Sequence, residues 1–230
     1  MLSFLNPDRL ARTYRDPISW AILAVDLFPL LAVLTMGWGA TPLVFLYWLE
    51  NLIIGAVTLA RMVAASVKNG PSGLAIMGFL GPFFIVHYGM FCLVHGVFVS
   101  AFSTLSGGAD GSTGVPDFTT PFFLIDQALS SGANMSLFVV AIIALQAFLF
   151  VQDYLLGGEF KTADVRSEMM APYGRIIVLH IGIFAGAFAL VALGEPMIGI
   201  LALILLRALW GVALSVHRRS RLDAALRSKS

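Results

Sequence analysis

FFIVHYGMFCLVHGVF, residues 83–98, is an apolar run that carries two histidines eight residues apart. A helix of about 20 apolar residues crosses the hydrocarbon core of a bilayer. The run lies inside a longer apolar stretch, residues 74–103, which is sufficient for one crossing. This stretch therefore predicts a membrane-spanning helix, and the two imidazoles raise the question of what they face.

The composition of the whole chain also indicates a membrane protein. Of the 230 residues, 59% are hydrophobic and 12% are charged, and the mean hydropathy is +0.90. This charged share is about half that of soluble domains, so most of the chain must face lipid. Cys92 is the single cysteine, which excludes an internal disulfide. No phosphate-binding, nucleotide-binding or nucleic-acid-binding motif is present, so the expected partners include the lipid bilayer and no nucleic acid.

The fold class predicted is all-α: a polytopic membrane protein built as a bundle of six transmembrane helices. The chain divides into an N-terminal segment (1–17), a transmembrane domain (18–216) with an outer loop (104–133), and a basic tail (217–230). The six stretches that are long and apolar enough to span are 18–38, 42–67, 74–103, 134–156, 175–193 and 196–216.

The positions of the basic residues predict the orientation. With six spans, all fourteen Lys and Arg residues fall on or toward one side of the membrane, and the 104–133 loop contains none. The positive-inside rule then places both termini in the cytoplasm and this loop outside. We expect the chain in the inner (cytoplasmic) membrane of a bacterium, with the basic tail on anionic lipid headgroups.

Ionisable side chains inside the spans are the candidates for function. Each costs a few kcal/mol in hydrocarbon, so such residues usually face the interior of a bundle and mark functional sites. The six candidates are Asp26, Glu50, His87, His95, His180 and Arg207.

A helical wheel for residues 83–98 predicts which side faces the bundle. At about 100° per residue, His87 and His95 share one face with Tyr88 and with Phe84, Phe91 and Phe98. Val86, Met90, Leu93 and Val97 lie on the opposite side, which suits lipid. The wheel therefore predicts that both histidines point into the bundle. The pair Gly81-Pro82 is expected to bend or interrupt the helix just before this face.

Depth along the spans groups the candidates into two levels. Glu50 and His95 each lie about eight residues from the outer end of their helices, so a contact between them is expected, with Asn51 or Tyr47 nearby. An inner group holds His87, His180, Asp26 and Arg207. A structural alternative is left open for the first pair, which would then only fix helix packing. Asp26 would pair with Arg207 or satisfy carbonyls freed by Pro29.

Short motifs in three of the spans resemble a known group of proteins. YWLEN at 47–51, HYGMFCLVHG at 87–96 and PYGR followed by His180 are similar to motifs of an uncharacterised family of bacterial and archaeal polytopic membrane proteins. That family has no established activity, so the resemblance implies that these residues form a set and implies no chemistry.

The leading hypothesis is a transition-metal ion (zinc, iron or copper) or haem bound in the polar core. The metal ligands would come from Glu50, His87, His95 and His180, because imidazole suits all of these metals. Residues expected to line the cofactor are Tyr88, Asn51, Asp26 and Arg207.

Other functional classes stay open at this stage, including whether the chain is an enzyme. The same residues would suit an intramembrane metal-dependent hydrolase acting on lipid-like substrates, although no Gly-x-Ser-x-Gly or His-Glu-x-x-His motif is present. They would also suit a small proton-linked transporter, an accessory subunit of a larger membrane complex, or a homo-oligomer.

Overall fold

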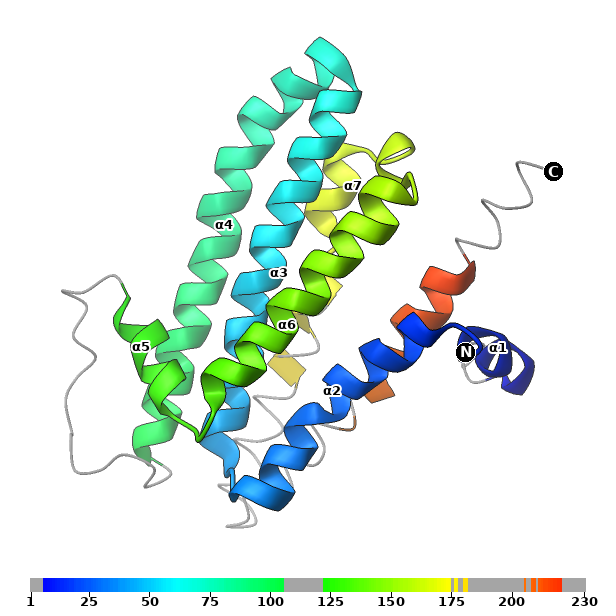
Figure 1. Cartoon of the computed structure of the whole chain (residues 1–230). Coiled ribbons are helices and arrows are strands. Elements are labelled where there is room, and N and C mark those ends of the chain that lie inside the picture. The colour runs from blue at the N-terminus through cyan, green and yellow to red at the C-terminus, as the bar shows by residue number, and fades with distance from the viewer. Residues whose placement is uncertain are drawn as a thin grey trace. The chain divides into compact units, whose positions relative to one another are not determined.

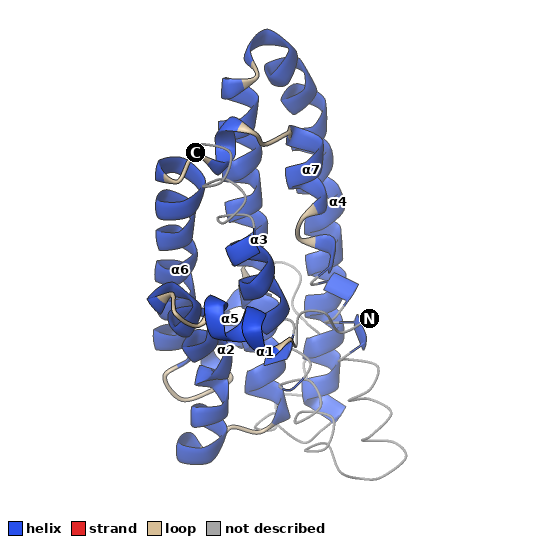
Figure 2. Ribbon diagram, turned by 90° about the vertical axis from the view of Figure 1, so that its right-hand side faces the viewer, coloured by secondary structure: helices blue, strands red, loops and turns tan. Residues whose placement is uncertain are grey.

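The computed structural model describes residues 6–105, 122–174, 176–177, 180–181, 205, 208–209 and 211–220. Within these ranges the chain consists of helices and short turns, with no strand (Figures 1 and 2). The all-α prediction is therefore confirmed for the described part of the chain.

The helices of the described residues follow one another with very short connections. They are α1 (Pro7–Thr13), α2 (Pro17–Met36), α3 (Ala40–Lys68), α4 (Gly70–Leu105), α5 (Phe123–Ser130), α6 (Met135–Leu149), the π-helix η2 (Phe150–Leu156), the 3-10 helix η3 (Glu159–Lys161) and α7 (Val165–Met170).

Four of these helical segments are long and apolar enough to cross a membrane: Pro17–Met36, Ala40–Lys68, Gly70–Ala101 and Met135–Leu156. They match the first four predicted spans to within a few residues. Most of the two remaining predicted spans, 175–193 and 196–216, lies outside the described residues. Helix α4 runs through Pro82 without a break, so Gly81-Pro82 does not interrupt it.

Local sequence explains where the first two helices begin and end. Each starts with a proline, whose missing N–H costs nothing at the first helical position. The side chains of Asn6 and Asp16 cap them by accepting hydrogen bonds from backbone N–H groups at 2.9 and 3.0 Å. Helix α2 ends at Gly37, whose φ of 67° lies in the left-handed region that favours glycine.

The chain forms two units. One contains Met1–Gly37 together with His180–Ser230, and the other contains Trp38–Leu179. In the first unit, the Arg218 guanidinium forms an ion pair of 2.7 Å with the Asp16 carboxylate. This contact joins the start of α2 to the helical residues 211–220.

The second unit is built around α3. Both views show α3 between α4 and α6, and its contacts with both helices agree (Figures 1 and 2). One residue, Asn69, separates α3 from α4, so the chain reverses at once and the two helices run antiparallel. A core of buried side chains joins α3, α4 and the segment after α6: Met62, Ala65, Phe84, Tyr88, Cys92, Val165 and Ile176.

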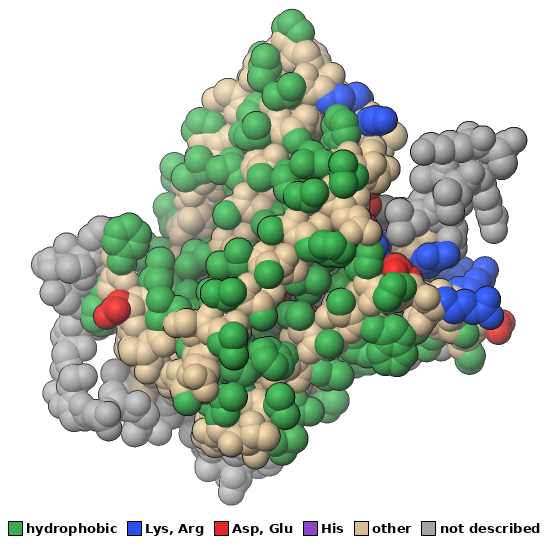
Figure 3. All heavy atoms as spheres, in the orientation of Figure 1, with side chains coloured by type: hydrophobic (Ala, Val, Ile, Leu, Met, Phe, Trp, Pro, Cys, Tyr) green, Lys and Arg blue, Asp and Glu red, His purple; other side chains and the backbone are tan. Residues whose placement is uncertain are grey.

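The outward surface of this unit is apolar. Large side chains such as Phe79, Val86, Met90 and Leu93 on α4, and Leu137 and Val140 on α6, are exposed. Hydrophobic side chains cover the face of the molecule shown in Figure 3. In water such a surface would be costly, whereas lipid tails suit it, so the described fold is that of a membrane protein.

Candidate functional site

Two side-chain donors set the register between α3 and α4. The indole Nε1 of Trp48 donates to the backbone carbonyl of Cys92 at 2.7 Å, and the hydroxyl of Tyr88 donates to the carbonyl of Asn51 at 2.9 Å. All four residues are buried. Donors without water nearby need such partners, so these bonds both satisfy the side chains and fix the helix pair.

Glycine permits this close approach of the two helices. A Cβ added at Gly55 would lie 2.5 Å from Cε1 of Tyr88, and one at Gly96 would lie 2.8 Å from the Trp48 ring. Ordinary side chains at these two positions would therefore push the helices apart. Cys92 and Gly96 are the buried small residues on this side of α4, whereas Gly89 is exposed with open space around it.

Most of the predicted site residues of this unit are buried. Glu50 is 3% exposed and His95 is 7% exposed, and Asn51 and Tyr88 are buried as well. An acid and an imidazole at these depths in apolar helices are costly, which agrees with the sequence prediction that they belong to the interior.

His95 is held in one orientation by its own helix. Its Nδ1 lies 2.6 Å from the carbonyl oxygen of Phe91. Because a carbonyl only accepts hydrogen bonds, Nδ1 carries the proton, and the lone pair of a neutral ring is on Nε2. The Phe91 ring stacks on the imidazole with centroids 6.4 Å apart. In this tautomer Nε2 is the acceptor atom of the ring.

The prediction for His87 is wrong in one respect: its side chain is exposed. Tyr88, Cys92 and Gly96 take the contact with α3, so the buried side of α4 is rotated toward them and away from His87. Phe98, placed on the same predicted face, is also exposed. The opposite side is as predicted, since Val86, Met90 and Leu93 are exposed.

Aromatic rings surround His87 at the edge of this face. Its imidazole stacks on Phe83 and meets the edge of Phe91, each with centroids 5.1 Å apart. Tyr173, which follows α7, lies 6.0 Å away. Burial raises the pKa of the Tyr173 phenol, so it stays protonated at neutral pH. Phe79, Phe83, His87, Phe91 and His95 form a column of rings spaced four residues apart along α4.

The side of α3 that carries Glu50 does not face α4. Trp48 contacts α4, and Glu50, two residues further, lies about 160° around the helix from it. The described contacts between these helices therefore do not join Glu50 to His95. A direct contact between the two side chains stays a prediction.

The remaining predicted residues belong to the other unit or lie outside the residues that the structure describes. Asp26 is buried in α2, and a Cβ at Gly211 would collide with its carboxylate, so glycine provides room for this acid. His180 is half-buried. Arg207 lies outside the described residues, and its pairing with Asp26 stays a prediction.

No group of three or more His, Cys, Asp or Glu side chains that could hold a metal ion occurs within the described residues. A metal site built from this part of the chain would therefore take at most two ligands of these types. Zinc sites use three or four protein ligands, so they need more than these residues supply.

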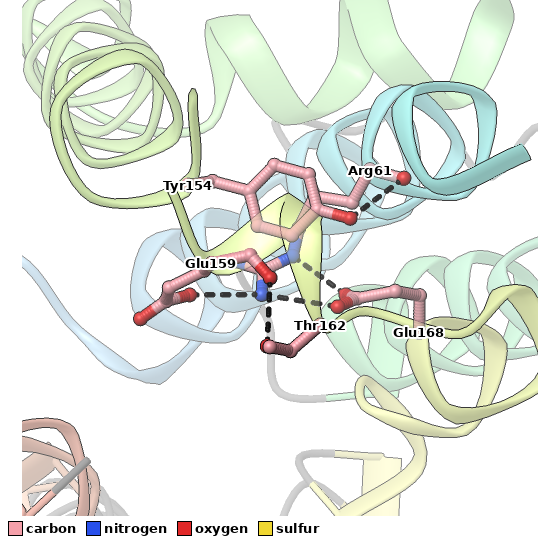
Figure 4. Close-up of polar contacts among 5 residues, drawn as sticks. All are labelled: Arg61, Tyr154, Glu159, Thr162 and Glu168. Carbon is pink, nitrogen blue, oxygen red and sulfur yellow. Dashed lines mark hydrogen bonds and ion pairs between the residues drawn. The ribbon is translucent and has the colours of Figure 1, made fainter. Parts of the chain in front are cut away.

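A second polar cluster lies around Arg61, which was not among the predicted site residues. Figure 4 shows Arg61 of α3 between two acids of the segment that follows η2. Its Nε lies 2.6 Å from Oε2 of Glu168, and its Nη2 lies 3.4 Å from Oε2 of Glu159. Its guanidinium also lies 4.1 Å from the centre of the Tyr154 ring. We call Arg61, Tyr154, Glu159 and Glu168 the arginine cluster.

The arginine cluster fixes the segment after η2 to α3. The Tyr154 hydroxyl donates to the carbonyl of Arg61 at 2.9 Å, and Asn69 donates to the carbonyl of Ala163 at 3.4 Å. One sequence signal for this cluster existed, because Glu159 and Glu168 are two acids in a short loop on the predicted side of Arg61. They are about 100 residues from Arg61 in the chain, so the sequence does not show which basic residue they pair with.

Comparison with known proteins gives a family and no activity. Residues 8–230 match the model of a family of unknown function, DUF6498. Searches of the curated proteins and of the solved structures gave no match.

Proposed function

We propose a function for this chain, which belongs to the family of unknown function DUF6498: an integral membrane protein that binds a transition-metal ion or haem iron through His95. The ligand atom would be Nε2. The site would lie within the membrane, since α3 and α4 are both long and apolar enough to cross it.

The orientation of His95 is the observation that carries this proposal. Histidines that ligate metals almost always donate their other ring N–H to a carbonyl or a carboxylate, which fixes the tautomer and the ring. His95 has this arrangement, because Nδ1 lies 2.6 Å from the Phe91 carbonyl. The ring is also buried, so a packing residue without polar atoms would cost less at this position.

The neighbouring residues have separate parts in the proposed site. Glu50 is the buried carboxylate that would balance the charge of a cation. Tyr88 and Asn51 would act as positioning residues, because the Tyr88 hydroxyl donates to the backbone carbonyl of Asn51 and so holds α4 against α3. His87 and His180 remain candidates for a further ligand. Haem requires the fewest protein ligands, since its iron takes one or two.

The test is elemental analysis and an optical spectrum of the full chain purified in mild detergent. We expect stoichiometric metal in the wild type and at least about a tenfold loss in His95→Ala. His217→Ala is the matched control, because His217 is exposed near the end of the helical residues 211–220. Iron with a haem spectrum would identify haem, and iron, zinc or copper without one would identify an ion. Equal metal content in His95→Ala and His217→Ala would overturn the proposal.

A second function fits the same residues: a buried proton-carrying pair in a transport or coupling protein. The observation that favours it is that Glu50 and His95 are two ionisable side chains buried in apolar helices. Proton uptake by reconstituted vesicles would test it, with Glu50→Gln as the variant. A metal-free wild type with proton uptake that falls in Glu50→Gln would favour this function, and metal-dependent behaviour would exclude it.

A further inference from the structure

Three arginines near the N-terminus lie at the surface, and no carboxylate of the described residues pairs with them. Arg9 and Arg12 in α1 and Arg15 just after it are all exposed. No ion pair among the described residues engages them. Figure 3 shows Lys and Arg side chains gathered around α1.

The nearest acid that follows them is already used. Asp16 caps α2 and forms the 2.7 Å ion pair with Arg218, and both side chains in that pair are nearly buried, 12% and 13% exposed. The other acid of this segment, Asp8, lies in the first turn of α1, where it favours the helix N-terminus. Among the described residues no carboxylate pairs with these exposed guanidinium groups, so they are available to an anionic ligand.

The aromatic residues beside the arginines mark the level of the membrane surface. Trp20, at the start of α2, is 57% exposed, and its Nε1 donates to the carbonyl of Tyr14 at 2.8 Å. Tryptophan concentrates at the boundary between headgroups and acyl chains. Below it, Leu27, Leu31 and Leu34 are exposed along the same helix, as a lipid-facing surface requires. The arginines come before Trp20 in the chain, on the headgroup side of this boundary.

We propose that Arg9, Arg12 and Arg15 form a binding surface for the headgroups of anionic phospholipids. Guanidinium groups bind phosphate with two parallel hydrogen bonds, and several exposed cations near a membrane favour anionic lipids. Arg9 and Arg12 are three residues apart, so they lie near each other on the surface of α1, and both side chains are exposed. This surface is separate from the proposed site at His95 and does not depend on it.

The experiment measures how much phosphatidylglycerol and phosphatidylcholine the purified full chain retains from an equal mixture, by native mass spectrometry. We expect the wild type to retain phosphatidylglycerol preferentially. In the variant Arg9→Gln/Arg12→Gln/Arg15→Gln, the preference for phosphatidylglycerol should fall about fivefold for each arginine removed. The control Lys68→Gln/Lys161→Gln/Arg166→Gln removes the same number of exposed charges from the other unit and should keep the preference.

A second measurement needs no arginine variant. Phosphatidylglycerol with brominated chains should quench the fluorescence of Trp20 more than brominated phosphatidylcholine does, with Trp20→Phe as the blank. Equal retention or equal quenching by the two lipids would overturn the proposal. So would equal loss in both triple variants, since binding would then follow net charge. Displacement of the lipid by millimolar inorganic phosphate would instead assign the surface to a soluble anion.

Discussion

Helix α3 carries polar groups in two regions that satisfy them in different ways. In its middle, against α4, Trp48 and Tyr88 are neutral donors that bond to backbone carbonyls. Near its end, Arg61 is an ion held by two carboxylates. Ions cost more than neutral groups to bury in hydrocarbon, so charge pairing suits the end of the helix, where the segment after η2 supplies acids.

Glu50 departs from this division. By the helical wheel it lies on the same side of α3 as Arg61, about 16 Å away along the axis. It is an ionisable acid in the region otherwise occupied by neutral donors, and it is 3% exposed. A residue that serves only packing would cost less here as glutamine or leucine, which is why Glu50 belongs to the candidate site.

The largest effect expected in this comparison comes from the close contact of α3 with α4. Gly55→Leu would place a side chain where the Tyr88 ring lies 2.5 Å from the added Cβ, so we expect a loss of about 3 kcal/mol in the free energy of unfolding. Gly89→Leu is the control on α4, since nothing lies within 4 Å of that site. Thermal unfolding in detergent measures both. Equal stability of the two variants would contradict the packing described here.

The next effect tests the charged region. Glu168→Gln removes the acid 2.6 Å from Nε of Arg61, and we expect it to cost about 2 kcal/mol of stability. Glu159→Gln removes the 3.4 Å partner, which is more exposed, and should cost less than about 1 kcal/mol. Denaturation in detergent at low and high salt checks this order. A larger loss in Glu159→Gln would show that the arginine cluster relies on the other acid.

A smaller effect tests the neutral region. Tyr88→Phe removes the donor to the Asn51 carbonyl with little change in shape, and we expect it to cost about 1 kcal/mol because a buried carbonyl loses its side-chain partner. Trp48→Phe removes the donor to the Cys92 carbonyl and also leaves a cavity, so it should cost more than Tyr88→Phe. Neither loss of stability should depend on the salt concentration, in contrast to the loss in Glu168→Gln. A salt dependence in Tyr88→Phe would mean that this region also contains a charge interaction.

The smallest effect separates the two histidines of α4. His87 is exposed, so His87→Gln should change stability by less than about 0.5 kcal/mol. His95→Gln should cost about 1 kcal/mol or more, because the ring is buried and bonded to the Phe91 carbonyl. Unfolding of the metal-free protein measures both. A greater loss in His87→Gln would mean that a partner covers this imidazole in the folded protein.

The sequence was sufficient for features that depend on one helix at a time. The four spans of the described residues follow from the length of each apolar run, and the lipid-facing side of α4 follows from Val86, Met90 and Leu93. The depth of Glu50 and His95 in their helices was also predictable, because position along a helix is fixed by residue number.

Features that depend on contact with another helix or a distant segment were not predictable from the sequence. The wheel placed His87 inward because it weighed the polarity of α4 alone, whereas Gly55 and Trp48 on α3 select Tyr88, Cys92 and Gly96 as the contact. Arg61 pairs with Glu159 and Glu168, about 100 residues further along the chain, and no sequence periodicity relates such distant positions.

The sequence by itself determined that the described part of the chain is helical and suited to a membrane, with polar residues buried in its spans, because apolar length and charge are local properties of the chain. The tertiary structure decided which histidine is enclosed and which arginine is neutralised. Those outcomes depend on the fit between two helix surfaces, and a rotation of α4 by less than one residue step exchanges a buried side chain for an exposed one.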